Sequence, residues 1–87
     1  MFIIQPVPKL LNIDGFRIMT YPNDHLPAHV HVIKDDGVII INLNEEGISP
    51  TVRESHGMKR QVERKAVTIV SENKAALLAG WREWHGE

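Results

Sequence analysis

Three of the five histidines of the chain lie close together, at His25, His29 and His31, and Asp24 precedes the first of them. His29 and His31 are two residues apart, so on a β-strand they project from the same face with Cβ atoms roughly 6–7 Å apart. Two imidazoles at that separation can bind one metal ion, or one can act as a base while the other acts as an acid. Because Pro27 fixes the chain direction, we expect His25 and Asp24 to fold back over the same face.

This histidine segment has three interpretations. In the first, the three histidines with Asp24 or water bind zinc or another transition metal. In the second, no metal is needed: the histidines act as general base and general acid on a phosphodiester, with Arg17 or Lys34 stabilising the negative charge that develops. In the third, Asn23 and Asp24 cap a turn, and the histidines form hydrogen bonds on a half-exposed sheet face without chemistry. The residue types and spacing leave all three open.

A second group of residues is cationic and comprises Lys59, Arg60, Arg64 and Lys65. These side chains would lie at the start of a predicted helix, where positive charge opposes the helix dipole. A negatively charged partner, such as a nucleic-acid backbone or an acidic protein, would explain why cations stand where the dipole favours acidic residues. The alternative is a solvated helix face on which Glu63 compensates part of the charge.

Composition restricts the function classes. The chain has 87 residues and no cysteine, which excludes disulfides, thiolate catalysis and cysteine-ligated metal sites. Its length predicts a single domain over residues 1–87. The net charge of −1 excludes the broad basic surface of many DNA-binding domains. No apolar run approaches the roughly 18 residues of a membrane helix, and no secretory signal is evident, so we expect a cytoplasmic protein without membrane contacts.

Period-two alternation and turn dipeptides predict strands. Residues 1–8 contain Pro6 and Pro8 and are interpreted as an edge segment or extended arm. Asp14 and Gly15 are suited to a tight hairpin turn, because both central positions of a type I′ turn need positive φ. The predicted strands are 9–13, 16–21, 28–34, 38–43 and 51–55.

After Gly57 the period of the apolar residues becomes helical. Apolar residues recur at spacings of three and four, at Val62, Ala66, Ile69, Val70, Leu77, Trp81 and Trp84. One helix over 58–84 would be about 40 Å long, which exceeds the expected diameter of the domain, so a break near 71–73 is the alternative. The predicted fold class is α+β: an antiparallel sheet of four to five short strands packed by one long C-terminal helix.

The segment 15–31 resembles the small bacterial proteins grouped as domain-of-unknown-function family 4160. Their hallmark is a hydrophobic strand ending in tyrosine, followed by Asn-Asp-His, a proline pair and His-Phe-His. The chain has Tyr21, the Asn-Asp-His triplet and both later histidines, whereas Ala28 replaces the second proline and Val30 the phenylalanine.

The C-terminal helix of that family ends in a Leu-Leu-x-x-Trp pattern, which Leu77, Leu78 and Trp81 reproduce. Ile69 and Asn73 stand where the family helix usually has a tryptophan and a histidine. This departure argues against a catalytic role for these helix positions. The segment 24–31 is then the feature that the chain shares with the family.

The resemblance spans roughly residues 15–81 and implies an α+β fold but no assigned activity. Such proteins are suspected, from their gene neighbourhoods, to belong to toxin–antitoxin pairs. Our leading hypothesis is therefore a bacterial toxin–antitoxin component, with an antitoxin as its partner. In it, Asp24 and the three histidines cleave RNA without a metal, while Arg17 and the cationic group of residues 59–65 hold the phosphate backbone. The alternative is a non-catalytic module that binds a metal or a partner protein.

Overall fold

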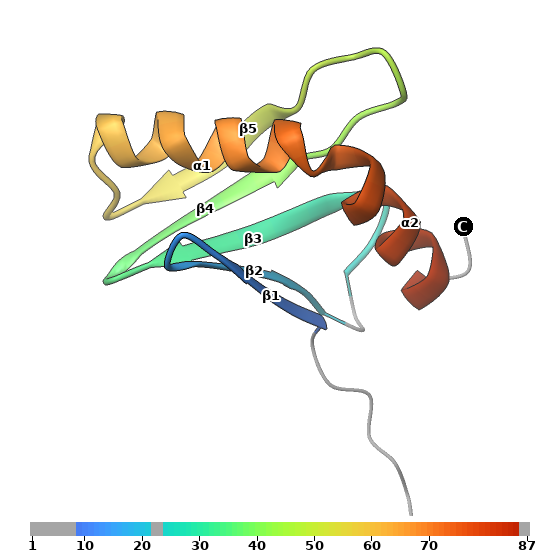
Figure 1. Cartoon of the computed structure of the whole chain (residues 1–87), viewed down its shortest axis with the longest axis horizontal. Helices are drawn as coiled ribbons and strands as arrows, with labels where there is room; N and C mark the ends of the chain where they lie inside the picture. Colours follow the sequence, from blue (N-terminus) through green and yellow to red (C-terminus); the bar gives the residue numbers. More distant parts are fainter. Residues whose placement is uncertain (1–8, 22–23, 86–87) are drawn as a thin grey trace, which may run out of the picture.

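The computed structural model describes residues 9–21 and 24–85, with side chains described for 11–21 and 24–83. Five antiparallel strands form one sheet in the order of the sequence (Figure 1). Their bounds are β1 Lys9–Ile13, β2 Phe16–Thr20, β3 His29–Lys34, β4 Gly37–Asn42 and β5 Thr51–His56. The expectation of four to five short strands is confirmed, and the arm predicted at 1–8 lies outside the described residues.

The first hairpin follows from its turn residues. Ile13 pairs with Phe16, so Asp14 and Gly15 are the two loop residues, with φ of 52° and 78°. Positive φ at both positions is what a type I′ turn requires, and glycine adopts it without steric cost. The hairpin predicted from the Asp-Gly dipeptide is confirmed.

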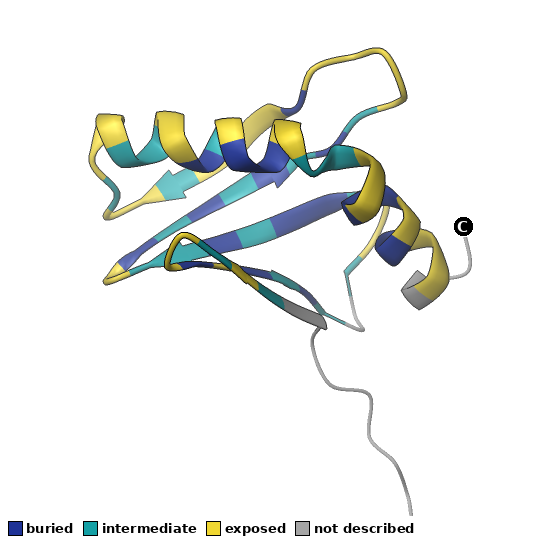
Figure 2. Ribbon diagram, in the orientation of Figure 1, coloured by how far each residue is buried: buried dark blue, intermediate teal, exposed yellow. Residues whose placement is uncertain are grey.

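One face of the sheet carries the hydrophobic core. Along the strands, every second residue is buried beneath the helices, namely Phe16, Ile18, Val30, Val32, Ile39 and Ile41. Helix α1, Arg60–Glu72, lies over this face and contributes Ala66, Ile69 and Val70 to the core. Figure 2 shows that the buried positions of α1 face the sheet and its exposed positions face outward.

The prediction of one long C-terminal helix is wrong in number, because the chain forms two helices. α1 ends at Glu72 and α2 spans Lys74–His85, so the break falls at Asn73, inside the alternative predicted at 71–73. The Asn73 backbone leaves helical geometry, at φ −112° and ψ 14°, and its Nδ2 donates a hydrogen bond of 2.8 Å to the Ile69 carbonyl. A short amide side chain that bonds to the backbone in this way competes with the helical ladder. The α2 axis consequently turns toward the end of the sheet (Figure 1).

α1 does not lie over the opposite face of the sheet, and α2 reaches it only at one end, where Trp81 contacts His29. Apolar side chains of intermediate burial lie on it at Met19, Ile33, Val38 and Ile40. His31 is the direct neighbour of Met19 on one side and of Ile40 on the other. We call this surface the open face. Within the described part of the chain, no helix is long and apolar enough to cross a membrane.

Candidate functional site

Strand β3 places its two histidines on the side opposite its two valines. Val30 and Val32 are fully buried in the core, so His29 and His31 project to the open face by the period of two. This arrangement was predicted from the sequence. His29 begins β3 and pairs with Asn42 of β4. The two imidazole centroids are 5.3 Å apart, close enough for both rings to serve one site.

Asp24 joins the histidines from the segment before β3. Its backbone N–H donates to the Tyr21 carbonyl at 3.0 Å, and its Oδ2 accepts from the Tyr21 N–H at 2.8 Å. These two bonds hold the carboxylate, so that Oδ1 lies 3.3 Å from Nε2 of His31 and 3.5 Å from Nε2 of His29. One ligand atom from each of the three residues lies within 4.8 Å of the other two. We call this group the Asp-His-His cluster.

A hydrogen bond to the backbone fixes which nitrogen of His29 carries its proton. Nδ1 of His29 lies 2.9 Å from the Pro27 carbonyl oxygen, which can only accept, so Nδ1–H is the donor. In a neutral ring, Nε2 then presents its lone pair toward Oδ1 of Asp24. Two acceptors that face each other at 3.5 Å repel unless a proton or a metal ion lies between them. Histidines that bind metals commonly donate their other ring N–H to a carbonyl in this manner.

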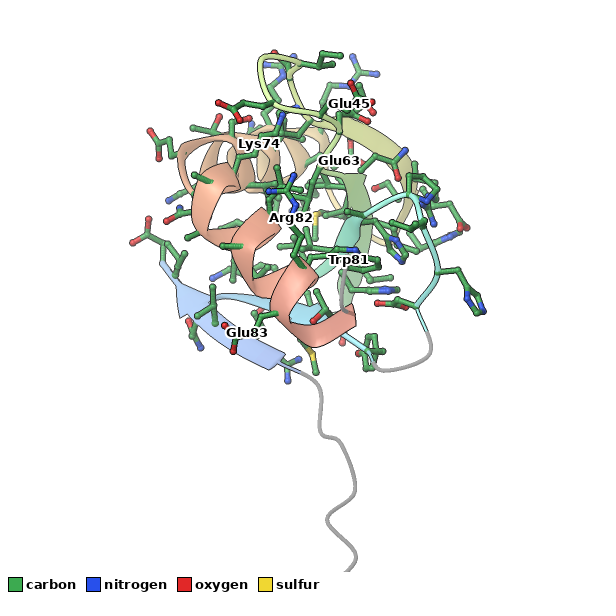
Figure 3. The ribbon with its side chains drawn as sticks, turned by 90° about the vertical axis from the view of Figure 1, so that its right-hand side faces the viewer. Glu45, Glu63, Lys74, Trp81, Arg82 and Glu83 are labelled. Carbon is green, nitrogen blue, oxygen red and sulfur yellow. The ribbon has the colours of Figure 1, made fainter. Side chains whose placement is uncertain are left out.

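The cluster is enclosed by aromatic rings. The His31 ring meets Tyr21 edge-on, with centroids 4.9 Å apart, and the His29 ring lies 5.2 Å from Trp81. Figure 3 shows Trp81 projecting from α2 toward the start of β3. The exposed fractions of the side chains are 6% for His29, 12% for Asp24 and 20% for His31. The cluster is therefore mostly shielded and meets solvent chiefly at His31.

The separations within the cluster suit a small transition metal. In a tetrahedral zinc site, with zinc–nitrogen and zinc–oxygen distances of about 2.0–2.1 Å, neighbouring ligand atoms lie about 3.4 Å apart. The two carboxylate–imidazole separations, 3.3 and 3.5 Å, are already at this value. Two histidines and one carboxylate are also a donor set that zinc, iron and other borderline metals accept.

The remaining predicted site residues do not join the cluster. His25 is exposed and lies outside the group of three. Arg17 is exposed on β2, where it pairs with Ile33. Lys34 lies over the Phe16 ring, with Nζ 5.2 Å from the centroid.

The cationic group of residues 59–65 lies at the far end of the molecule from the cluster. All four side chains are exposed at the start of α1, beside the β3–β4 turn. The start of β3 and its histidines lie at the other end of the sheet, next to α2 (Figure 1). A helix of 13 residues such as α1 is about 20 Å long, so the two groups do not form one compact site.

Arg53 lies beside the cluster, a position that the sequence did not predict. Its Nε donates to Oδ1 of Asn42 at 2.9 Å, and its Nη2 lies 3.5 Å from the Pro27 carbonyl that also accepts from His29. No spacing rule links residue 53 to residues 24–31. Only the pairing of β5 with β4, and of β4 with β3, brings them together.

Comparison with known families agrees with the resemblance noted above. The model of a family described as Domain of unknown function (DUF4160) matches residues 15–82, which include the whole Asp-His-His cluster. No curated protein and no solved structure gives a significant match to the chain.

Proposed function

We propose that this chain, which belongs to the Domain of unknown function (DUF4160) family, binds a transition metal ion, with zinc as the first candidate, through the Asp-His-His cluster. The observation that carries the proposal is the close approach of Oδ1 of Asp24 to Nε2 of His29, at 3.5 Å, while Nδ1–H of His29 donates to the Pro27 carbonyl. A cation between these atoms removes their repulsion and uses both lone pairs.

Three protein ligands leave a coordination position for water or for a substrate atom. Zinc sites of that kind are typical of catalysis, whereas structural zinc sites have four protein ligands. When bound, the metal would supply Lewis acidity and would lower the pKa of a coordinated water. The chain would contribute the orientation of both imidazoles, through the Pro27 carbonyl and the aromatic contacts, and exclusion of bulk water by Trp81.

Titration of the metal-free chain with zinc and with cobalt(II) tests the proposal. Wild type should bind one ion, and the cobalt form should show the intense visible bands of four-coordinate cobalt. His29→Ala and His31→Ala should each weaken binding more than about 100-fold, because even outer partners of a ligand are worth 10–100-fold. His25→Ala, which removes an exposed histidine of the same segment, is the matched control and should bind as wild type does. Equal loss in all three variants, or no binding by wild type, would contradict the proposal.

Action on RNA within a toxin–antitoxin pair remains a prediction. The cluster would then act without a metal, with one imidazole as general base and the other as general acid. The separation of residues 59–65 from the cluster weighs against a single compact RNA site that uses both.

A bacterial growth assay tests this second function. Wild type is expressed beside the His29→Ala/His31→Ala double variant, whose folding is checked by circular dichroism. Growth arrest by wild type alone supports the toxin hypothesis, and RNA integrity is then the next readout. Normal growth with both proteins removes it and leaves metal binding as the function to test.

A further inference from the structure

The guanidinium of Arg53 is held beside the Asp-His-His cluster by two neutral acceptors. Nε donates to the Asn42 side-chain oxygen at 2.9 Å, and Asn42 is the direct neighbour of His29 across the β3–β4 ladder. Nη2 lies 3.5 Å from the Pro27 carbonyl oxygen, which also accepts the 2.9 Å bond from Nδ1 of His29. One carbonyl oxygen therefore links the guanidinium to an imidazole of the cluster.

An irregularity in β5 aims Arg53 in this direction. Ile40 pairs with Glu54 and Ile41 pairs with Val52, so the register shifts and Arg53 has no direct partner on β4. Such β-bulges are over-represented next to active sites, where they redirect a side chain. Here the extra residue carries its side chain over Asn42 toward the start of β3. In a regular ladder, residue 53 would instead pair directly with a residue of β4.

The charge of Arg53 is not neutralised within the described part of the chain. The ion pairs found there join His29 and His31 to Asp24, and His56 to Glu54, and none involves Arg53. Arg53 is exposed, and its two bonds to neutral acceptors leave further guanidinium N–H donors. A fixed guanidinium with free donors matches the two oxygens of a phosphate or a carboxylate.

We propose that Arg53 is a substrate-binding residue that holds an oxyanion, phosphate or carboxylate, next to the Asp-His-His cluster. This inference rests on the proposed function and defines its substrate class as anionic. An ion bound by the remaining donors of Arg53 would lie on the open face, beside the strand positions of Asn42 and His29. The guanidinium would orient the anion and would offset its negative charge near the carboxylate of Asp24.

Anion titrations of the cobalt(II)-loaded chain test the inference. Inorganic phosphate and acetate are the probes, and the shift of the visible cobalt bands reports binding. Arg53→Gln should bind cobalt as wild type does but should weaken the preferred anion at least about tenfold, because hydrogen bonds to charged groups are the strong ones. Arg53→Lys should restore part of the affinity, since it returns the charge without the planar fork. Tighter binding of phosphate or of acetate shows whether the site prefers a phosphate or a carboxylate.

The matched control is Arg17→Gln, which removes an exposed arginine from β2 on the same face. Unchanged anion affinity in this control supports a site at Arg53. Equal weakening by both substitutions, or no effect of either anion on wild type, overturns it.

The metal titration itself shows whether metal binding has failed, independently of anion binding at Arg53. If wild type binds no cobalt, phosphate is titrated into the metal-free chain and followed by amide chemical shifts. Shifts around Asn42 that disappear in Arg53→Gln would keep the anion site, and their absence would overturn it.

Discussion

The two faces of β3 differ sharply although their residues alternate along one segment. Val30 and Val32 have no exposed surface and pack beneath the helices, whereas His29 and His31 face the opposite way and meet a carboxylate and two aromatic rings. The valine side is maintained by apolar contact, which tolerates exchange of one aliphatic residue for another of similar volume. The histidine side depends on directional polar contacts of particular imidazole and carboxylate atoms, and another residue type at these positions would lose them. A domain this small thus forms its core and its candidate site on one strand.

Two adjacent isoleucines of β4 give the largest effect that separates the faces. Ile39 is fully buried on the core face, and Ile40 is half-buried on the open face. Ile39→Ala should lower the free energy of unfolding by about 2–5 kcal/mol, the usual cost of a core cavity. Ile40→Ala should cost about 1 kcal/mol or less, because solvent already reaches that side. Urea unfolding of both variants measures the difference, and equal costs would mean that the open face is covered in solution.

Zinc should stabilise the folded chain only when the Asp-His-His cluster is intact. A ligand that binds only the folded chain, at a free concentration 100 times its Kd, adds about 2.7 kcal/mol to the free energy of unfolding. Thermal unfolding of wild type should shift upward with zinc and return when a chelator is added. His31→Ala should show no shift, while Ile40→Ala should keep most of it. An equal shift in His31→Ala would place the stabilising ion elsewhere.

The smallest effect is expected at the far end of α1. Replacing Arg60 and Arg64 by glutamine should change the free energy of unfolding by no more than about 0.5 kcal/mol, because both side chains are exposed. Their distance from the cluster predicts unchanged zinc affinity. Calorimetric titration with zinc checks this, and a clear loss of affinity would show that the two ends of the molecule are coupled.

Periodic features of the fold could be predicted from the sequence. The period of two put His29 and His31 on one face, and the Asp-Gly dipeptide located the first hairpin, because both depend on local geometry alone. The excessive length of a continuous helix predicted a break near 71–73 as the alternative, and the break falls at Asn73. A side chain such as that of Asn73, which can bond to backbone acceptors, is visible in the sequence. Whether it ends the helix cannot be decided from that one residue.

The composition of the cluster could be predicted only in part. Asp24 and His25 were both expected over the histidine face, yet only Asp24 reaches it, because its two bonds with the Tyr21 backbone set the direction of its side chain. Loop paths of this kind have no period to read. Arg53 could not be found at all, since a register shift between β4 and β5 brings it to the site.

Anomalous diffraction at the zinc edge, from crystals of the zinc-loaded chain, would locate the bound ion directly. We expect one peak, about 2.0–2.2 Å from Oδ1 of Asp24 and from Nε2 of both His29 and His31. His25→Ala crystals should show the same peak. A peak on other residues, or crystals in which the cluster stays empty at saturating zinc, would contradict the assignment of a metal site to this face of the sheet.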